Sequence, residues 1–134
     1  MENIKSIIKE FFIEKTQILA VDLFGSFAKG TQNSFSDIDI AILCDPQNLP
    51  SKLDILQWRE DLNGLLKKEI DLICLNDSSP IIGMQVEQNK IPIIRKDENG
   101  YAHYIMKLYS EYAELKELRK PMESNILKRK YYNE

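Results

Sequence analysis

The stretch Leu23-Phe24-Gly25-Ser26-Phe27-Ala28-Lys29-Gly30, with its sequel Ser36-Asp37-Ile38-Asp39-Ile40, decides the fold of this chain. An apolar run from Ile18 to Phe24 leads into the Gly-Ser pair, and a second apolar run carries the two aspartates. Because alternate residues of a β-strand point to the same face, we expect the carboxylates of Asp37 and Asp39 to lie side by side. The stretch predicts two strands joined by a polar turn, with charge concentrated where they meet.

Helical and strand patterns alternate along the rest of the chain. Strands are predicted over residues 17–24, 38–44, 69–75 and 91–94, the last at a sheet edge because of Pro92. Helices are predicted over residues 4–15, 26–29, 51–68, 79–88 and 101–120, with a final helical piece over 122–132. We expect Pro121 to break or kink the long helix. The leucines expected to be buried by the helix over 51–68 are Leu53, Leu56, Leu62, Leu65 and Leu66.

This order of elements predicts an α+β fold, with a small mixed sheet and helices packed on it. The short connection between the first two strands makes them antiparallel neighbours, whereas helical connections leave room for crossovers later in the chain. We expect residues 1–96 to form the core. Residues 97–134 are expected to form a C-terminal helical extension packed on the same single domain.

Composition and charge narrow the class of protein. The 134 residues are 43% hydrophobic and 29% charged, as in ordinary globular domains. A net charge of −3 disfavours a general nucleic-acid scaffold, so no direct nucleic-acid binding is expected. No membrane span and no signal-peptide apolar segment are visible, so we expect a soluble cytoplasmic protein. Cys44 and Cys74 are then expected to be reduced core residues.

Three acidic residues are predicted to converge at one end of the sheet. The first strand ends at Gly25, the second begins at Asp37 and Asp39, and the third begins at Asp71. Mg²⁺ prefers oxygen ligands and is usually held by one or two carboxylates plus substrate phosphates. Converging carboxylates repel one another, so this arrangement needs a metal. The alternative is that Asp-x-Asp makes only local hydrogen bonds at a strand end; the ordered combination favours nucleotide chemistry.

The Gly-Ser turn is the predicted phosphate site. Gly25 lets the backbone approach a phosphate closely, and Ser26 can offer its hydroxyl and the amides of the turn behind it. Lys29 either adds a cation beside the phosphates or is a solvated surface residue.

These residues resemble the signature of the DNA polymerase beta-like nucleotidyltransferase superfamily. The resemblance comprises the stretch Leu23 to Gly30, the segment Ser36 to Ile40, and Ile70-Asp71-Leu72 at the third acidic position. It covers Ile18 to about Ile94. Size and the lack of further domains are similar to those of the minimal nucleotidyltransferases, specifically the MntA-like adenylyltransferase antitoxins encoded with HEPN-domain toxins.

The resemblance implies a role for each matching residue. Gly25 and Ser26 would hold the triphosphate of ATP, Asp37 and Asp39 would coordinate two Mg²⁺ ions, and Asp71 would complete the metal site and help activate the acceptor hydroxyl. The reaction would transfer AMP to a tyrosine of a cognate HEPN RNase toxin, release pyrophosphate and silence the toxin. Alternatives are an antitoxin that acts by occlusion without catalysis, and an adenylyltransferase with a small-molecule acceptor.

Two further features stay open. The tyrosines at positions 101, 104, 109 and 112 form a helical stripe that either packs against the core or a partner, or stacks on an adenine ring. The basic run from Lys128 to Lys130 contacts RNA or an acidic partner, or is a solvated helix end.

Overall fold

A four-stranded mixed sheet forms the centre of the molecule. The computed structural model describes the backbone of residues 2–30 and 37–132, and the side chains of residues 3–30 and 37–121; the loop predicted at 31–36 lies outside these ranges. The strands are β1 (Ile18–Phe24), β2 (Ile38–Cys44), β3 (Ile70–Cys74) and β4 (Ile91–Arg95), in the order β3-β2-β1-β4. β1 pairs antiparallel with β2 and with β4, whereas β2 pairs parallel with β3. The predicted mixed sheet is confirmed, as is the edge position of the strand that contains Pro92.

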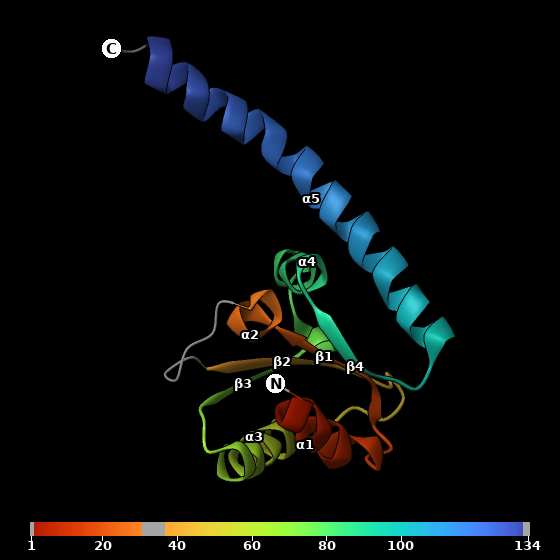
Figure 1. Ribbon diagram of the computed structural model, residues 1–134. Coiled ribbons are helices and arrows are strands. Elements are labelled where there is room, and N and C mark those ends of the chain that lie inside the picture. The colour runs from red at the N-terminus through yellow and green to blue at the C-terminus, as the bar shows by residue number, and fades with distance from the viewer. Residues whose placement is uncertain (1, 31–36, 133–134) are drawn as a thin grey trace.

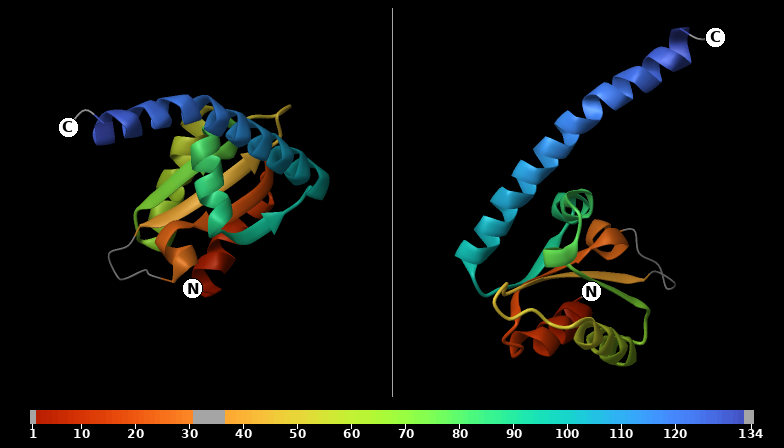
Figure 2. Two further views of the ribbon diagram at one scale, coloured as in Figure 1. Left: turned by 90° about the horizontal axis from the view of Figure 1, so that it is seen from above. Right: turned by 180° about the vertical axis from the view of Figure 1, so that it is seen from behind.

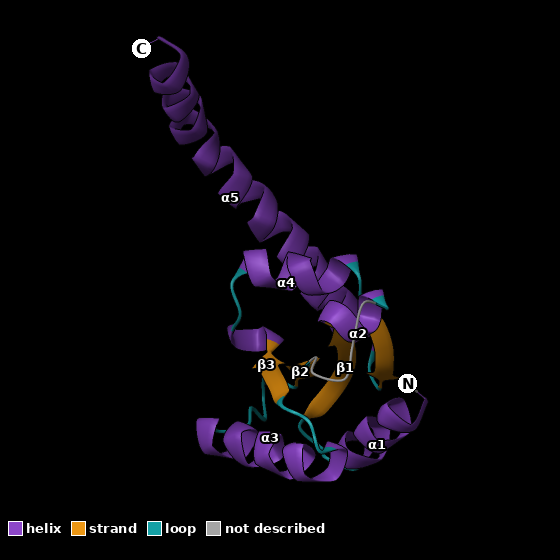
Figure 3. Ribbon diagram, turned by 60° about the vertical axis from the view of Figure 1, so that its left-hand side comes forward, coloured by secondary structure: helices purple, strands orange, loops and turns teal. Residues whose placement is uncertain are grey.

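Helices cover both faces of this sheet (Figure 1). On one face lie α1 (Glu2–Ile13) and α3 (Lys52–Leu66), and on the other lie α2 (Gly25–Lys29), α4 (Pro80–Gln88) and α5 (Glu98–Tyr132). A short 3-10 helix, η1 (Leu75–Asp77), follows β3. The view in Figure 3 shows α4 next to the first part of α5. The chain therefore forms a layered α+β fold.

Serine side chains cap the starts of α3 and α4. The Ser51 hydroxyl accepts a hydrogen bond from the Asp54 N–H at 3.0 Å, and the Asp54 carboxylate accepts one from the Ser51 N–H at 3.0 Å. At the start of α4 the Ser79 hydroxyl accepts a hydrogen bond from the Ile82 N–H at 3.3 Å, and Pro80 stands at the first helical position. Both side chains satisfy N–H groups that a helix start leaves without partners.

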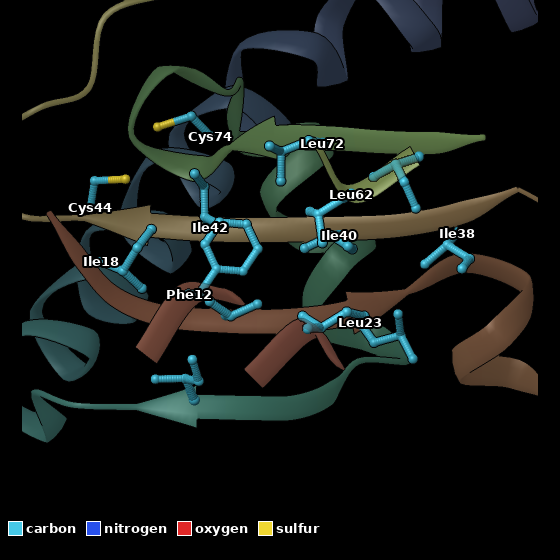
Figure 4. Close-up of a cluster of buried hydrophobic side chains, with 14 of the residues drawn as sticks. Phe12, Ile18, Leu23, Ile38, Ile40, Ile42, Cys44, Leu62, Leu72 and Cys74 are labelled. Atoms are coloured by element: carbon cyan, nitrogen blue, oxygen red, sulfur yellow. The ribbon is translucent and has the colours of Figure 1, made fainter. Parts of the chain in front are cut away.

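The main core lies between the sheet and the pair α1 and α3 (Figure 4). Phe12 of α1 is fully buried there, and Leu62 of α3 reaches the same cluster. The prediction for α3 was partly wrong, because Leu53, Leu56 and Leu65 are 77%, 49% and 56% exposed. The stripe that packs against the core instead comprises Ile55, Trp58, Leu62 and Leu66. A single narrow face of α3 reaches the sheet, so only one of its two apolar stripes is covered.

The last helix runs through Pro121 without the predicted break. α5 is one helix from Glu98 to Tyr132, and Figure 2 shows its second part extending away from the sheet. Residues 116–121 are exposed, so water can satisfy the carbonyl that proline leaves without an N–H donor. None of the described helices carries an apolar stretch long enough to cross a membrane.

Candidate active site

Gly25 and Asp39 make the closest contact of the predicted site. Phe24 lies opposite Asp39 in the β1–β2 pairing, and the chain turns at Gly25, which has φ +72°. A Cβ atom on residue 25 would lie 2.0 Å from Oδ2 of Asp39. Glycine is required here for the left-handed backbone and for the space that the carboxylate occupies.

The three predicted acids share this end of the sheet. Asp39 lies opposite Asp71 in the parallel β2–β3 pairing, and Asp37 directly precedes β2. Asp39 is partly buried, whereas Asp37 and Asp71 are exposed. Burial raises the pKa of the Asp39 carboxyl above its ordinary value, and the charges of Asp71 and Asp37 raise it further. Asp39 is therefore surrounded by negative charge.

This donor set fits a hard divalent cation. Within the described part of the chain, no three His, Cys, Asp or Glu side chains are grouped closely enough to hold a metal ion on their own. Mg²⁺ does not need such a closed set, since it usually takes one or two carboxylates and completes its shell with water and substrate phosphate oxygens. A cation here would also remove the repulsion that raises the pKa of Asp39.

The short helix α2 holds the Gly-Ser turn beside these acids. Phe27 is 4% exposed and anchors α2 on the sheet, and Gly30 (φ +76°) ends the helix with its N–H donated to the Ser26 carbonyl. Ser26 is partly buried next to Gly25. Lys29 is exposed at the end of α2, and no hydrogen bond or ion pair from another described residue fixes its ammonium group. The structure thus brings Gly25 and Ser26 to the acids, and Lys29 stays a prediction.

Sequence analysis missed an ion-pair network on the same face of the sheet. Asp22, only 1% exposed, accepts a hydrogen bond from Nη2 of Arg95 at 2.6 Å. The Arg95 guanidinium lies 3.9 Å from the ring centre of Tyr101, whose hydroxyl donates to Glu87. Glu87 is also paired with Lys90. The available signal was an aspartate inside an apolar strand, but its partner lies 73 residues further along the chain.

The structure shows how two of the four tyrosines in the helical stripe pack. Tyr101 and Tyr104 pack against the smaller buried cluster on the α4 side of the sheet, which confirms the packing interpretation for both. Burial and the charge of Glu87 raise the pKa of Tyr104 to about 12, so its hydroxyl keeps its proton at neutral pH. Tyr109 is 51% exposed.

The comparisons with known proteins agree with this geometry. The family model described as "Polymerase beta, Nucleotidyltransferase" matches residues 6–99. The chain therefore belongs to the polymerase beta nucleotidyltransferase family.

Two relatives narrow the similarity within that family. A protein of Methanocaldococcus jannaschii named "Putative protein adenylyltransferase" is 33% identical over 95 residues, which cover 68% of this chain and 95% of the relative. The protein adenylyltransferase MntA of Shewanella oneidensis is 34% identical over 87 residues, which cover 63% of this chain and 59% of that protein.

Solved structures share the fold over nearly the whole chain. A crystal structure of a toxin–antitoxin with AMP-PNP matches with a TM-score of 0.80 at 22% identity, covering 92% of this chain and 98% of that one. A complex of a tri-AMPylated HEPN toxin of Shewanella oneidensis with its MNT antitoxin matches with a TM-score of 0.76 at 19% identity, covering 94% and 98%. At these identities, the matches establish the fold.

Proposed function

We propose that this chain is a protein adenylyltransferase that transfers AMP from ATP to a hydroxyl group of a partner protein. The observation that carries the proposal is the contact of Gly25 with Asp39, opposite Asp71 on the neighbouring strand. This contact puts a backbone turn suited to phosphate beside the Asp39 carboxylate, to which Asp71 and Asp37 add negative charge. The protein adenylyltransferases among the relatives support a protein acceptor.

Each residue has a role in this reaction. Asp37, Asp39 and Asp71 would hold two Mg²⁺ ions, which when bound supply positive charge to the phosphates and make the attacking hydroxyl more acidic. Gly25 and Ser26 bind and orient the triphosphate. Asp71, on the exposed edge strand, orients the acceptor hydroxyl toward the α-phosphorus. A bond forms between the acceptor oxygen and that phosphorus, the bond to the β-phosphate bridging oxygen breaks, pyrophosphate leaves, and the hydroxyl proton passes to Asp71 or water.

The partner in this proposal is a HEPN-domain RNase toxin, and the acceptor is one of its tyrosines. Modification would silence the toxin, so this chain would act as its antitoxin. Two toxin–antitoxin complexes among the solved structures with this fold support the choice of partner. In this proposal residues 1–96 are the catalytic core and residues 97–134 an extension packed on it.

A transfer assay tests the proposal. The chain, Mg²⁺ and ATP labelled at the α-phosphate are incubated with the HEPN-domain toxin proposed as its partner, and the label is located by mass. Wild type should label the partner on tyrosine, and Asp39→Asn should not. Asp61→Asn, an exposed carboxylate on α3, is the matched control and should label normally.

The other outcomes separate the alternatives. Equal neutralisation of the partner by wild type and Asp39→Asn, with no label, would show that the chain acts by occlusion. Label in a low-mass product would identify a small-molecule acceptor.

A further inference from the structure

A groove lies on the α5 side of the sheet, at the opposite end of β2 from Asp39. Its volume is about 650 Å³, within the range of about 300–1,000 Å³ that is usual for ligand sites. Its floor includes the buried side chains of Leu43, Leu75 and Leu108. Leu49, which lines the same groove, is 50% exposed. The groove therefore offers a partner an apolar floor and one exposed leucine.

Negative charge dominates the polar lining of this groove. It has four carboxylates and one lysine, which are Asp45, Asp77, Asp97, Glu111 and Lys107. Lys107 and Glu111 are both well exposed and 3.8 Å apart, and such a pair compensates little charge in water. A partner that fits the groove should therefore be both apolar and basic.

The four carboxylates of the lining repel an anionic nucleotide, so the groove suits a different occupant. Asp39 and Leu43 point to the same side of β2 and are four residues apart, which corresponds to roughly 13 Å along a strand. A protein partner can span this distance, because a usual interface buries about 800 Å² on each side. A compact small-molecule acceptor at Asp71 would leave the groove unused.

We propose that this groove is a docking site for the protein that accepts AMP. The inference rests on the proposed function and names the surface by which its acceptor is recognised. The groove binds a segment in which an apolar side chain is flanked by lysine or arginine. The apolar side chain contacts Leu49 and the groove floor, and the basic side chains lie against the four carboxylates. Opposite charge speeds association and makes it sensitive to salt.

Charge reversal at two of the carboxylates tests this docking site. Asp45 and Asp97 each accept a local backbone hydrogen bond, from the N–H of Gln47 at 2.9 Å and of Gly100 at 3.0 Å, so they are left in place. The test variant is therefore Asp77→Lys/Glu111→Lys. Its matched control is Glu10→Lys on α1 combined with Glu14→Lys directly after that helix, which makes the same change in charge on the opposite face of the sheet.

Initial rates of AMP transfer are measured against the concentration of the HEPN-domain toxin proposed as the partner. The groove variant should raise the KM for that protein by about tenfold with little change in kcat, because docking and not chemistry is altered. The control should keep the wild-type KM. Leu49→Ser should also raise KM, without a change of charge. The melting temperature of every variant is measured to confirm folding.

A direct measurement of binding to the partner separates the proposed docking site from the proposed AMP transfer. If wild type transfers AMP and the groove variants keep its KM, the docking site is wrong and the proposed function stands. If wild type transfers no AMP, the proposed function fails, and calorimetric binding of the same partner then decides the docking site. Loss of affinity in the groove variants alone supports it, and equal affinity overturns it. A wild-type dimer that these variants convert to a monomer also overturns it, by assigning the groove to self-association.

Discussion

Asp22 and Asp39 are buried or partly buried acids on the same face of the sheet, and their surroundings carry opposite charge. Asp22 lies opposite Ala41 in the β1–β2 pairing, and Asp39 lies two pairs further along, opposite Phe24. Burial is the main cause that raises the pKa of both carboxyls. For Asp22 the Arg95 guanidinium opposes this rise, whereas for Asp39 the neighbouring charges add to it.

The difference separates a structural acid from a functional one. The chain itself supplies the cation for Asp22, so removing that cation should cost stability. Among the described residues, the charges that act on the pKa of Asp39 are those of Asp71 and Asp37, so we expect the compensating charge to come from a bound ion. Variants of the two regions should therefore fail in different ways.

Of all the variants, one at Asp71, beside Asp39, should lower the rate of AMP transfer most. Asp71→Asn should lower the rate of AMP transfer on the order of 10³-fold, because a ligand of the proposed metal site and the group that orients the acceptor are lost together. Single-turnover transfer of labelled AMP to the partner gives this rate. Normal transfer by Asp71→Asn would assign the acid a role outside the reaction.

Variants of the Asp22–Arg95 ion pair should instead lose stability. Arg95→Met leaves the Asp22 carboxylate buried and unpaired, and should lower the free energy of unfolding by about 3 kcal/mol. Asp22→Asn/Arg95→Met should recover much of this loss. Lys120→Met removes the exposed pair with Glu117 (3.5 Å) and should change little. Urea denaturation measures all three, and equal losses in Arg95→Met and Lys120→Met would contradict the structural role.

Gly25 tests the close contact with Asp39. Gly25→Ala should reduce AMP transfer roughly 10²-fold, because the added Cβ displaces the carboxylate. Gly30→Ala is the matched control, since Gly30 has a similar φ of +76° but nothing within 4 Å of its added Cβ. Both variants carry backbone strain of about 1–2 kcal/mol. Similar transfer rates in the two would show that the contact is unimportant.

The smallest effect is expected on the thermal stability of the Asp39→Asn variant. The pKa of Asp39 is higher in the fold than in the unfolded chain, so its charge weakens the fold at neutral pH and stops doing so below the unfolded pKa of about 3.9. In metal-free buffer, Asp39→Asn should therefore raise the melting temperature at pH 7 slightly, because solvent screens the charge of a carboxyl that is only partly buried. This gain should disappear near pH 3. A gain that is independent of pH would point to a cause other than charge.

The sequence predicts the candidate active site better than it predicts the Asp22–Arg95 ion pair. Gly25, Asp39 and Asp71 lie at strand boundaries, and strand boundaries with alternating side chains are local properties of the chain. The Asp22–Arg95 pair depends on β4 returning to pair with β1, and the covered stripe of α3 depends on how that helix meets the sheet. The passage of α5 through Pro121 likewise depends on solvent around the helix. None of these can be read from local spacing.

A titration with Mg²⁺ alone measures whether the end of the sheet that carries Asp39 binds a cation. The melting temperatures of wild type, Asp39→Asn and Asp22→Asn are measured at increasing MgCl₂, with NaCl of equal ionic strength as the reference. Wild type should be stabilised, by about 1.4 kcal/mol when free Mg²⁺ is about ten times its dissociation constant. Asp22→Asn should show the same increment from its own starting temperature, and Asp39→Asn should show none. An equal response in Asp39→Asn, or none in wild type, would show that Asp39 does not hold a cation.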